Sequence, residues 1–294
     1  MTTNLEAELV LDQRCELGEG PIWDAAAAEL VWVDIVGRSI LRYRPADGAV
    51  STLSTPSDVG SVAVRAGGGY VAALADGFWT VGPGSDDWTH LAPVDADRPD
   101  RRFNDGKCDP AGRFLAGTMG YAKRPGMGAL YRLDTDGNVE RLLGDVTISN
   151  GLAWSEDGRT FYYIDTPTRR VDAFDYDPAT GRLAGRRPWI VLPDDEPGSP
   201  DGMTIDTDGG LWVALWGGWA VHRFDRAGRL DTIVRLPVSH VTSCTFGGAT
   251  LEDLYITSAW SERTDEQRAA EPHAGSVFRV RPGFRGYPPV EFAG

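Results

Sequence analysis

The sequence predicts an all-β protein, and more specifically a six-bladed β-propeller. Short runs rich in Val, Ile, Tyr, Phe and Trp recur along the chain and are separated by turns that contain glycine. No convincing amphipathic helix interrupts them. Successive units begin at Gly20, Ser61, Asp105, Gly151, Gly202 and Cys244. Their period of about 40–50 residues, with four short strands in each unit, is typical of propeller blades.

Within each unit the strands follow in a regular order. One strand of each unit is expected at residues 30–34, 69–74, 114–118, 161–165, 211–215 and 254–258. A further strand is expected at residues 40–43, 129–133, 171–176, 221–224 and 276–280. Residues 8–11 are expected to close the ring as an outer strand of the last blade, and residues 261–271 to form a loop or a short turn of helix. We therefore predict one propeller domain over residues 1–294, with a pair of β-sandwiches as the alternative.

Composition excludes several classes of protein. The chain has 29 basic and 43 acidic residues, a net charge of −14, which argues against nucleic acid and anionic membranes as partners. No apolar run is long enough to span a bilayer, and the first twelve residues lack the pattern of a signal peptide. Three widely spaced cysteines without a CxxC motif favour a reduced, cytoplasmic location. We expect a monomer or a weak homodimer.

Polar residues recur at one phase of the repeat. The residues immediately before the six first strands are Glu19, Gly60, Asn104, Asn150, Asp201 and Ser243. Residues at this phase converge on the axis of a propeller, and four of the six carry a carbonyl or carboxylate oxygen. A divalent cation would reconcile two carboxylates and two amides on one axis, and an all-oxygen set suits Ca²⁺, Mg²⁺ or Mn²⁺. Taken singly, the Asn-Asp-Gly, Asn-Gly and Asp-Gly sequences are also ordinary turns.

Other catalytic motifs are missing from the sequence. The four histidines form no HxH or HExxH pair, and no G-x-S-x-G motif is present. His240 lies in the approach to the sixth blade, and whether it contributes to the site stays open. Cys108 and Cys244 fall inside first strands, where we expect them to be buried small apolar residues.

Several motifs, taken together and in order, resemble the gluconolactonase/regucalcin/luciferin-regenerating family. They are LGEGPIWD (17–24), RFNDGKCDPAGR (102–113), AGTM (116–119), SNGLAWS (149–155), PDGM (200–203) and TSCTFGG (242–248). The resemblance covers nearly the whole chain. It implies a six-bladed propeller with one divalent cation in its channel and the hydrolysis of sugar lactones.

The resemblance also implies roles for individual residues. Glu19, Asn150 and Asp201 would be direct metal ligands, and Asp201 would also act as the general base. Asn104 would lie at the metal or bind substrate, and Arg102 would bind substrate hydroxyls. We favour Ca²⁺ as the cation, with Zn²⁺, Mg²⁺ and Mn²⁺ as alternatives.

One departure from the family pattern concerns the sugar pocket. After AGTM, animal regucalcin-like members have an acidic pair, one carboxylate of which touches substrate, whereas this chain has Gly120 and Tyr121. We expect Tyr121 to bind substrate in its place, and the identity of the lactone stays open. Two alternatives also remain: a non-catalytic Ca²⁺-binding protein, and a broader esterase or phosphotriesterase on the same scaffold.

Overall fold

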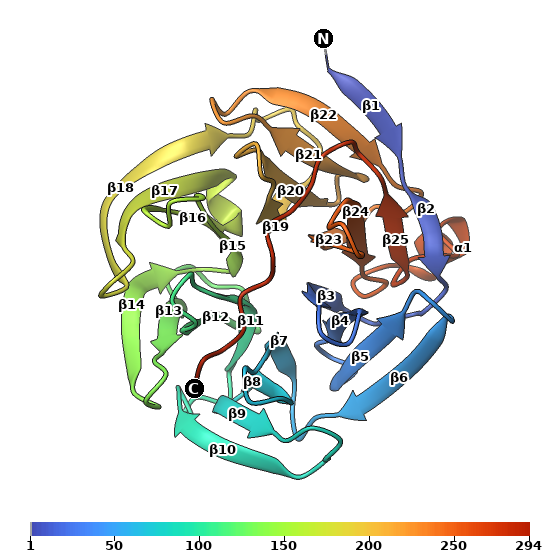
Figure 1. Cartoon of the computed structure of the whole chain (residues 1–294). Helices are drawn as coiled ribbons and strands as arrows, with labels where there is room; N and C mark the ends of the chain where they lie inside the picture. Colours follow the sequence, from blue (N-terminus) through green and yellow to red (C-terminus); the bar gives the residue numbers. More distant parts are fainter. Residues whose placement is uncertain (1) are drawn as a thin grey trace.

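The strands form six sheets around a central channel in the computed structural model, which describes residues 2–294 (Figure 1). Neighbouring strands within a blade are antiparallel, apart from the added strand β1 of the fifth blade. From the channel outward, the first blade consists of β3 (Gly18–Asp24), β4 (Glu29–Asp34), β5 (Ser39–Arg44) and β6 (Ala49–Ser54). The second blade consists of β7 (Val59–Val64), β8 (Tyr70–Leu74), β9 (Gly77–Val81) and β10 (Trp88–Pro93). The third blade consists of β11 (Arg101–Cys108), β12 (Phe114–Gly120), β13 (Gly128–Leu133) and β14 (Val139–Val146). The fourth blade consists of β15 (Ser149–Trp154), β16 (Thr160–Asp165), β17 (Arg170–Asp177) and β18 (Arg182–Val191). The fifth blade consists of β19 (Ser199–Ile205), β20 (Leu211–Trp216), β21 (Ala220–Phe224), β22 (Leu230–Arg235) and β1 (Thr3–Glu6). The sixth blade consists of β23 (Val241–Gly247), β24 (Asp253–Ser258), β25 (Val277–Val280) and β2 (Glu8–Leu11). The predicted six-bladed propeller is confirmed.

The N-terminal residues close the ring. Strand β2 pairs antiparallel with β25, so the last blade is completed by the beginning of the chain, as the sequence predicted for residues 8–11. Strand β1, which the sequence analysis did not predict, pairs parallel with β22 and adds a fifth strand to the fifth blade. The chain start is thus hydrogen-bonded to two adjacent blades.

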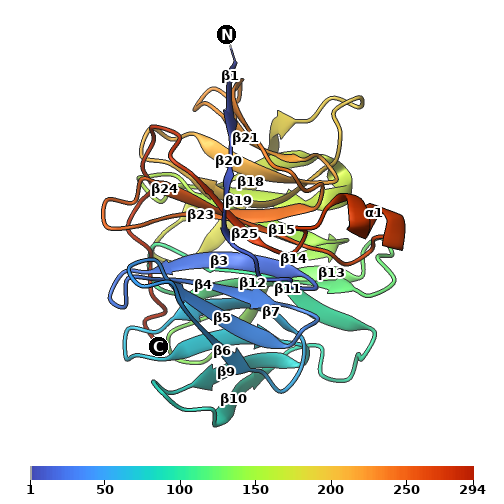
Figure 2. The same cartoon turned by 90° about the vertical axis from the view of Figure 1, so that its right-hand side faces the viewer.

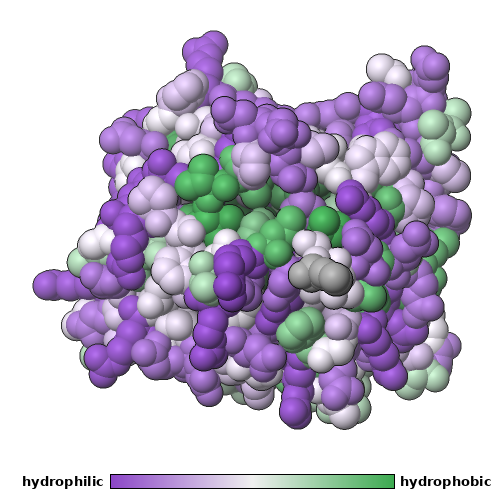
Figure 3. Space-filling model, turned by 90° about the horizontal axis from the view of Figure 1, so that it is seen from above, coloured by the Kyte–Doolittle hydropathy of each residue, from purple (hydrophilic) through white to green (hydrophobic). Residues whose placement is uncertain are grey.

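The hydrophobic core is divided among the six seams between neighbouring blades. Trp32 and Tyr255 pack in the seam between the sixth and first blades, and Phe78, Phe103 and Phe114 pack between the second and third. All three cysteines are free and buried. Because each blade packs on both sides, a middle strand such as β12 is wholly buried, whereas outer strands such as β18 are largely exposed. Hydrophilic side chains cover most of the outer surface seen in Figure 3, with one apolar patch at its centre.

Each of the six inner strands is interrupted by a shift in register near its beginning. The shifts follow Glu19, Val59, Phe103, Asn150, Pro200 and Val241. A β-bulge turns the side chains beside it away from the regular alternation. The convergent polar residues, which were expected immediately before the strands, lie inside the strands, at these bulges. In the second blade the corresponding residue is Gly60, where a Cβ atom would come within 2.5 Å of the Asn104 carbonyl oxygen.

The two ends of the channel differ in what covers them. Helix α1 (Asp265–Ala270) lies at one end, and the C-terminus lies at the other (Figure 2). The other helical element in residues 2–294 is the short 3₁₀ turn η1 (Thr166–Thr168). The C-terminal segment crosses the ring and is fixed beyond the channel by hydrogen bonds from the Phe292 amide to the Val64 carbonyl and from the Ala293 amide to the Gly112 carbonyl (Figure 1). It covers a mainly apolar cavity of about 320 Å³. The α1 end holds the polar residues described next.

Candidate functional site

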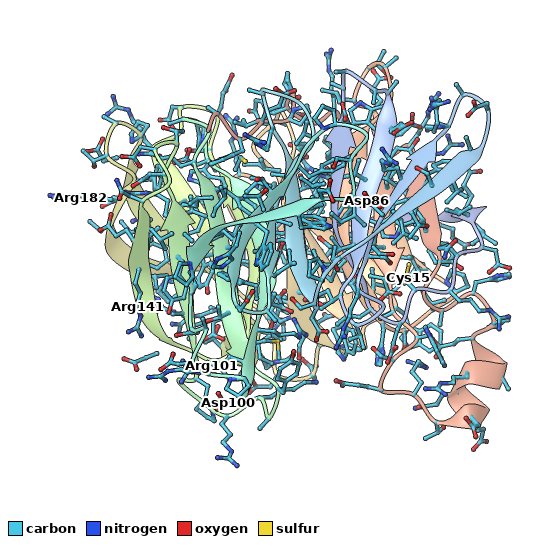
Figure 4. All side chains as sticks on the ribbon, turned by 90° about the horizontal axis from the view of Figure 1, so that it is seen from below. Cys15, Asp86, Asp100, Arg101, Arg141 and Arg182 are labelled. Carbon is cyan, nitrogen blue, oxygen red and sulfur yellow. The ribbon has the colours of Figure 1, made fainter. Side chains whose placement is uncertain are left out.

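One cavity of about 110 Å³ at the α1 end of the channel brings together five of the predicted site residues. They come from four blades: Glu19 on β3, Arg102 and Asn104 on β11, Asn150 on β15, and Asp201 on β19. Figure 4 shows Asp100 and Arg101, at the start of β11, at the same end of the molecule as α1. The inner strands therefore carry their bulged starts, and the side chains beside them, to this mouth.

Glu19 and Asp201 are buried carboxylates without a cationic partner. Their residues are 3% and 6% exposed, and among residues 2–294 neither forms an ion pair with Lys, Arg or His. Burial, followed by the charges of Asp201 and Asp105, raises the pKa of Glu19 well above its ordinary value. Burial, followed by the charge of Asp105, raises the pKa of Asp201 in the same direction. A cation placed between the two carboxylates would remove this unfavourable arrangement.

The two asparagines belong to a chain of hydrogen bonds that crosses three blades. The Asn104 Nδ2 donates to Asn150 Oδ1 at 2.9 Å and to the Ser149 carbonyl at 2.8 Å. The Asn150 Nδ2 donates to Thr166 Oγ1 at 2.8 Å, and this hydroxyl donates to the Pro200 carbonyl, next to Asp201. These bonds fix both amide planes and leave Asn150 Oδ1 with a second lone pair.

The donors present suit a hard cation. Carboxylate and amide oxygens are the ligands that Ca²⁺ and Mg²⁺ prefer, and neither a thiol nor an imidazole lines this cavity in the described part of the chain. Residues 2–294 also contain no cluster of three or more His, Cys, Asp or Glu side chains placed to hold a metal. The set that fits a cation is therefore two carboxylates, Glu19 and Asp201, completed by the amide of Asn150 and, next to it, Asn104.

Arg102 lies beside these donors and is 7% exposed. Its Nη1 donates to Asn104 Oδ1 at 2.7 Å and to the Phe103 carbonyl at 2.8 Å, both neutral acceptors. The guanidinium carbon lies 6.0 Å from the centroid of the Tyr121 ring. Tyr121 itself is not part of the cavity wall, and its hydroxyl donates to Asp58 Oδ2 at 2.8 Å. The structure thus places Tyr121 at the edge of the site, against Arg102.

Two further groups at the mouth have no signal in the sequence. The Lys123 ammonium lies 2.5 Å from the Glu262 carboxylate, and both residues line the cavity although 139 positions separate them. Trp216 also lines it, and the His240 ring stacks on Trp216 with 3.8 Å between ring centroids. Burial lowers the pKa of His240 to about 4, so this ring is neutral at neutral pH. His240 contacts the site through Trp216 and is not in the cavity wall.

Deeper in the channel, Asp105 and Lys107 form a second layer below the cavity. Burial raises the pKa of Asp105, and the charge of Lys107 opposes that rise. The Lys107 ammonium donates to the Met203 carbonyl at 2.8 Å and also lines the larger cavity at the C-terminal end. Both residues follow Asn104 in sequence, so the spacing of the motif could have identified them.

Comparison with known proteins identifies the family of the chain. The family model described as the SMP-30/gluconolactonase/LRE-like region matches residues 17–260. The chain belongs to this family. Among its relatives are regucalcins from Gallus gallus, 44% identical over 299 residues, and Homo sapiens, 40% identical over 300 residues. Each comparison covers 99% of this chain and all of the relative.

Solved structures of family members have the same fold. A calcium-binding protein, regucalcin, from Agrobacterium tumefaciens superposes with a TM-score of 0.95 at 28% identity and full coverage of both chains. A luciferin-regenerating enzyme gives 0.90 at 32% identity, covering 98% of this chain and all of the other. A gluconolactonase from Xanthomonas campestris gives 0.75 at 26% identity, covering 94% and 89%. In residues 2–294, none of the helices has the length and apolar character needed to cross a membrane.

Proposed function

We propose that the protein is a metal-dependent hydrolase of sugar lactones. The observation that carries the proposal is the buried pair Glu19 and Asp201, which has no cationic partner and lies beside the Asn150 amide in an open cavity. Membership in a family that includes gluconolactonases supports it. A divalent cation held by these residues, for which we favour Ca²⁺, would polarise the lactone carbonyl and stabilise the charge that develops on its oxygen.

The protein's own side chains would supply the remaining chemistry. Water attacks the carbonyl carbon, and Asp201 accepts the proton that this water loses. The bond between that carbon and the ring oxygen then breaks, and Asp201 returns the proton to the ring oxygen, which leaves as a hydroxyl group. The product is the open-chain hydroxy acid. Arg102, fixed through Nη1, has its other donors free to orient the substrate.

The test is a chelation and reconstitution experiment. Protein stripped of divalent ions is assayed against a panel of aldonolactones with a pH indicator, and again after adding back Ca²⁺, Mg²⁺, Mn²⁺ or Zn²⁺. We expect turnover to disappear on stripping and to return with at least one cation. Turnover that is unaffected by stripping would contradict the proposal.

A second candidate function is non-catalytic calcium binding. The observation that favours it is the match to regucalcins and to a structure described as a calcium-binding protein. The same preparation separates the two: a purely binding protein would gain thermal stability from Ca²⁺ without hydrolysing any lactone. Aryl esters and phosphotriesters, included in the panel, would reveal a broader hydrolase.

A further inference from the structure

The charged side chains that line the cavity would not be balanced after a divalent cation binds. Two positive charges on a bound cation would balance the carboxylates of Glu19 and Asp201. Lys123 is balanced by Glu262. Asp58, the acid nearest the Tyr121 hydroxyl, is paired with Arg38 at 3.0 Å. Of the two cations that line the cavity, Arg102 is therefore the one that forms no ion pair with a carboxylate of the described residues.

An unpaired guanidinium in this position is unusual because it is buried. Charged groups are rarely removed from water unless an opposite charge compensates them. Among residues 2–294, the only acceptors that Arg102 uses are the Phe103 carbonyl and the Asn104 amide, and both are contacted through Nη1. The remaining N–H groups of its planar fork stay available to a ligand in the cavity, and such a fork matches a carboxylate in two parallel hydrogen bonds.

The side chain that lies against the Arg102 guanidinium is the ring of Tyr121. Gly120 and Tyr121, which follow the AGTM motif, carry no carboxylate. Tyr121 presents its ring to the guanidinium and directs its hydroxyl to Asp58. Tyr121 therefore offers Arg102 its ring and no carboxylate.

A second cation stands at the mouth of the same cavity. Lys123 and Glu262 are both about half exposed, and an exposed ion pair of this kind contributes little stability. A ligand carboxylate can therefore exchange with Glu262 for the Lys123 ammonium at small cost. Arg102 and Lys123 line the cavity together with the candidate metal ligands, so an anion bound by them belongs to the same ligand as the ester.

We infer that the substrate is a sugar lactone that carries a free carboxylate, which Arg102 binds with help from Lys123. This inference rests on the proposed function for the identity of the ester, but not for the binding of the anion. It names a chemical class, the monolactones of sugar dicarboxylic acids, as opposed to neutral aldonolactones.

Two matched pairs of compounds test the inference on the intact, metal-loaded protein. The lactones are D-glucaro-1,4-lactone and D-glucono-1,4-lactone, which differ in a terminal carboxylate against a hydroxymethyl group. The open-chain acids are D-glucarate and D-gluconate, whose Kd values are measured by calorimetry at a fixed free Ca²⁺ concentration. We expect the carboxylate-bearing member to have a kcat/KM higher, and a Kd lower, by about 10–100-fold, because charge-assisted hydrogen bonds to a buried guanidinium are strong.

The variants Tyr121→Glu and Tyr121→Gln assign the effect to Arg102. They are nearly equal in shape and differ in charge, so only Tyr121→Glu gives Arg102 a carboxylate from the protein. Tyr121→Glu should remove most of the preference, and Tyr121→Gln should keep it. An exposed cation at the opposite end of the channel, changed as Arg226→Met, should leave both ratios unchanged.

The outcomes separate this inference from the proposed function. If both lactones turn over equally and both acids bind equally, the inference is overturned while lactone hydrolysis stands. If D-glucarate binds more tightly but no lactone is hydrolysed, the anion site stands and the proposed activity fails. Equal loss of preference in Tyr121→Glu and Tyr121→Gln would also overturn the assignment to Arg102.

Discussion

Buried carboxylates at the two ends of the inner strands have opposite surroundings. At the C-terminal end, Asp206 is fully buried and accepts hydrogen bonds from the Arg223 guanidinium at 2.6 Å, from Trp212 Nε1 at 2.8 Å, and from the amides of Asp208 and Gly210. At the α1 end, Glu19 is almost as buried, but the only hydrogen bond that its carboxylate accepts from the described residues comes from the adjacent Gly20 amide.

The number of hydrogen-bond donors around a buried carboxylate distinguishes those that stabilise the fold from those that are candidates for binding a ligand. Asp109 in the third blade repeats the arrangement of Asp206, with Arg113 at 2.5 Å, the Ala111 amide at 2.9 Å and a hydrogen bond from Tyr176. Such carboxylates have a full set of donors and stabilise turns. Glu19 and Asp201 lack donors of this kind, and an unsatisfied pair of like charges costs stability unless a ligand neutralises it. Burial of a carboxylate alone therefore does not indicate a ligand-binding site. Burial without hydrogen-bond donors or a cationic partner does.

The largest expected effect is on turnover. Asp201→Asn removes both the proton acceptor and one charge from the candidate metal site. We expect kcat/KM for the best lactone to fall by about 10³-fold or more. Steady-state assays at saturating Ca²⁺ measure it, with a urea unfolding curve to show that the variant is folded. Turnover within tenfold of the unsubstituted protein would remove Asp201 from the mechanism.

The next effect is on stability and concerns the other end of the strands. Asp206→Ala removes the fully buried partner of the Arg223 guanidinium, which keeps only the partly exposed Asp231, and it also removes the acceptor of Trp212 Nε1. We expect the free energy of unfolding to fall by about 3–5 kcal/mol. The midpoint of urea unfolding measures the loss. Asp225→Ala is the matched control, because Asp225 makes the same turn contacts to the Ala227 and Arg229 amides at the surface. A loss as large in the control would mean that burial is not the cause.

A smaller effect, of opposite sign, is expected for the unpaired carboxylate. Glu19→Gln removes one of two buried like charges, so the metal-free protein should become more stable at neutral pH, by on the order of 1 kcal/mol. The same change should abolish most of the stabilisation that added Ca²⁺ gives to the unsubstituted protein. Thermal unfolding with chelator and with Ca²⁺ measures both. A destabilised metal-free variant would show that Glu19 is a structural residue like Asp206.

The smallest effect is the dependence of stability on pH in the metal-free protein. The pKa values of Glu19 and Asp201 are raised in the folded state, so the folded protein binds more protons than the unfolded chain. Stability from these groups is therefore fully present below the ordinary carboxyl pKa of about 4 and is lost as pH rises through the raised values. The unfolding midpoint should fall with increasing pH above about 4, and less steeply in Glu19→Gln. An equal slope in both proteins would assign the dependence to other groups.

Repetition made much of the fold predictable. The turns and the period of the strands indicate six blades, and residues 8–11 pair with β25 as expected. The polar phase of the repeat also identified the residues that line the cavity. The prediction that these residues come just before the strands was wrong, because Asn104 and Asp201 lie within strands, at bulges. A bulge could not be predicted there, because the Asn-Asp-Gly and Asp-Gly sequences at these points are equally typical of turns.

Other features depend on contacts that no local pattern records. Strand β1 is a short, mostly polar segment that pairs with the edge of β22, far away in the sequence. Lys123 and Glu262 meet across the mouth from loops far apart in the chain. The sequence identified Arg102 as a substrate-binding candidate, but whether a protein carboxylate pairs with it is a question of distance.

The amino-acid sequence by itself determined the number of blades, the phase at which oxygen-bearing side chains converge, and the family. These follow from periodic local preferences and from motifs that are continuous in the chain. Only the tertiary structure decided which of the buried charges are paired: Asp206 with Arg223, and Glu19, Asp201 and Arg102 with no ion-pair partner in the described residues. Electrostatic energy depends on separation in space and on burial, and both are set by how the six blades pack around the channel.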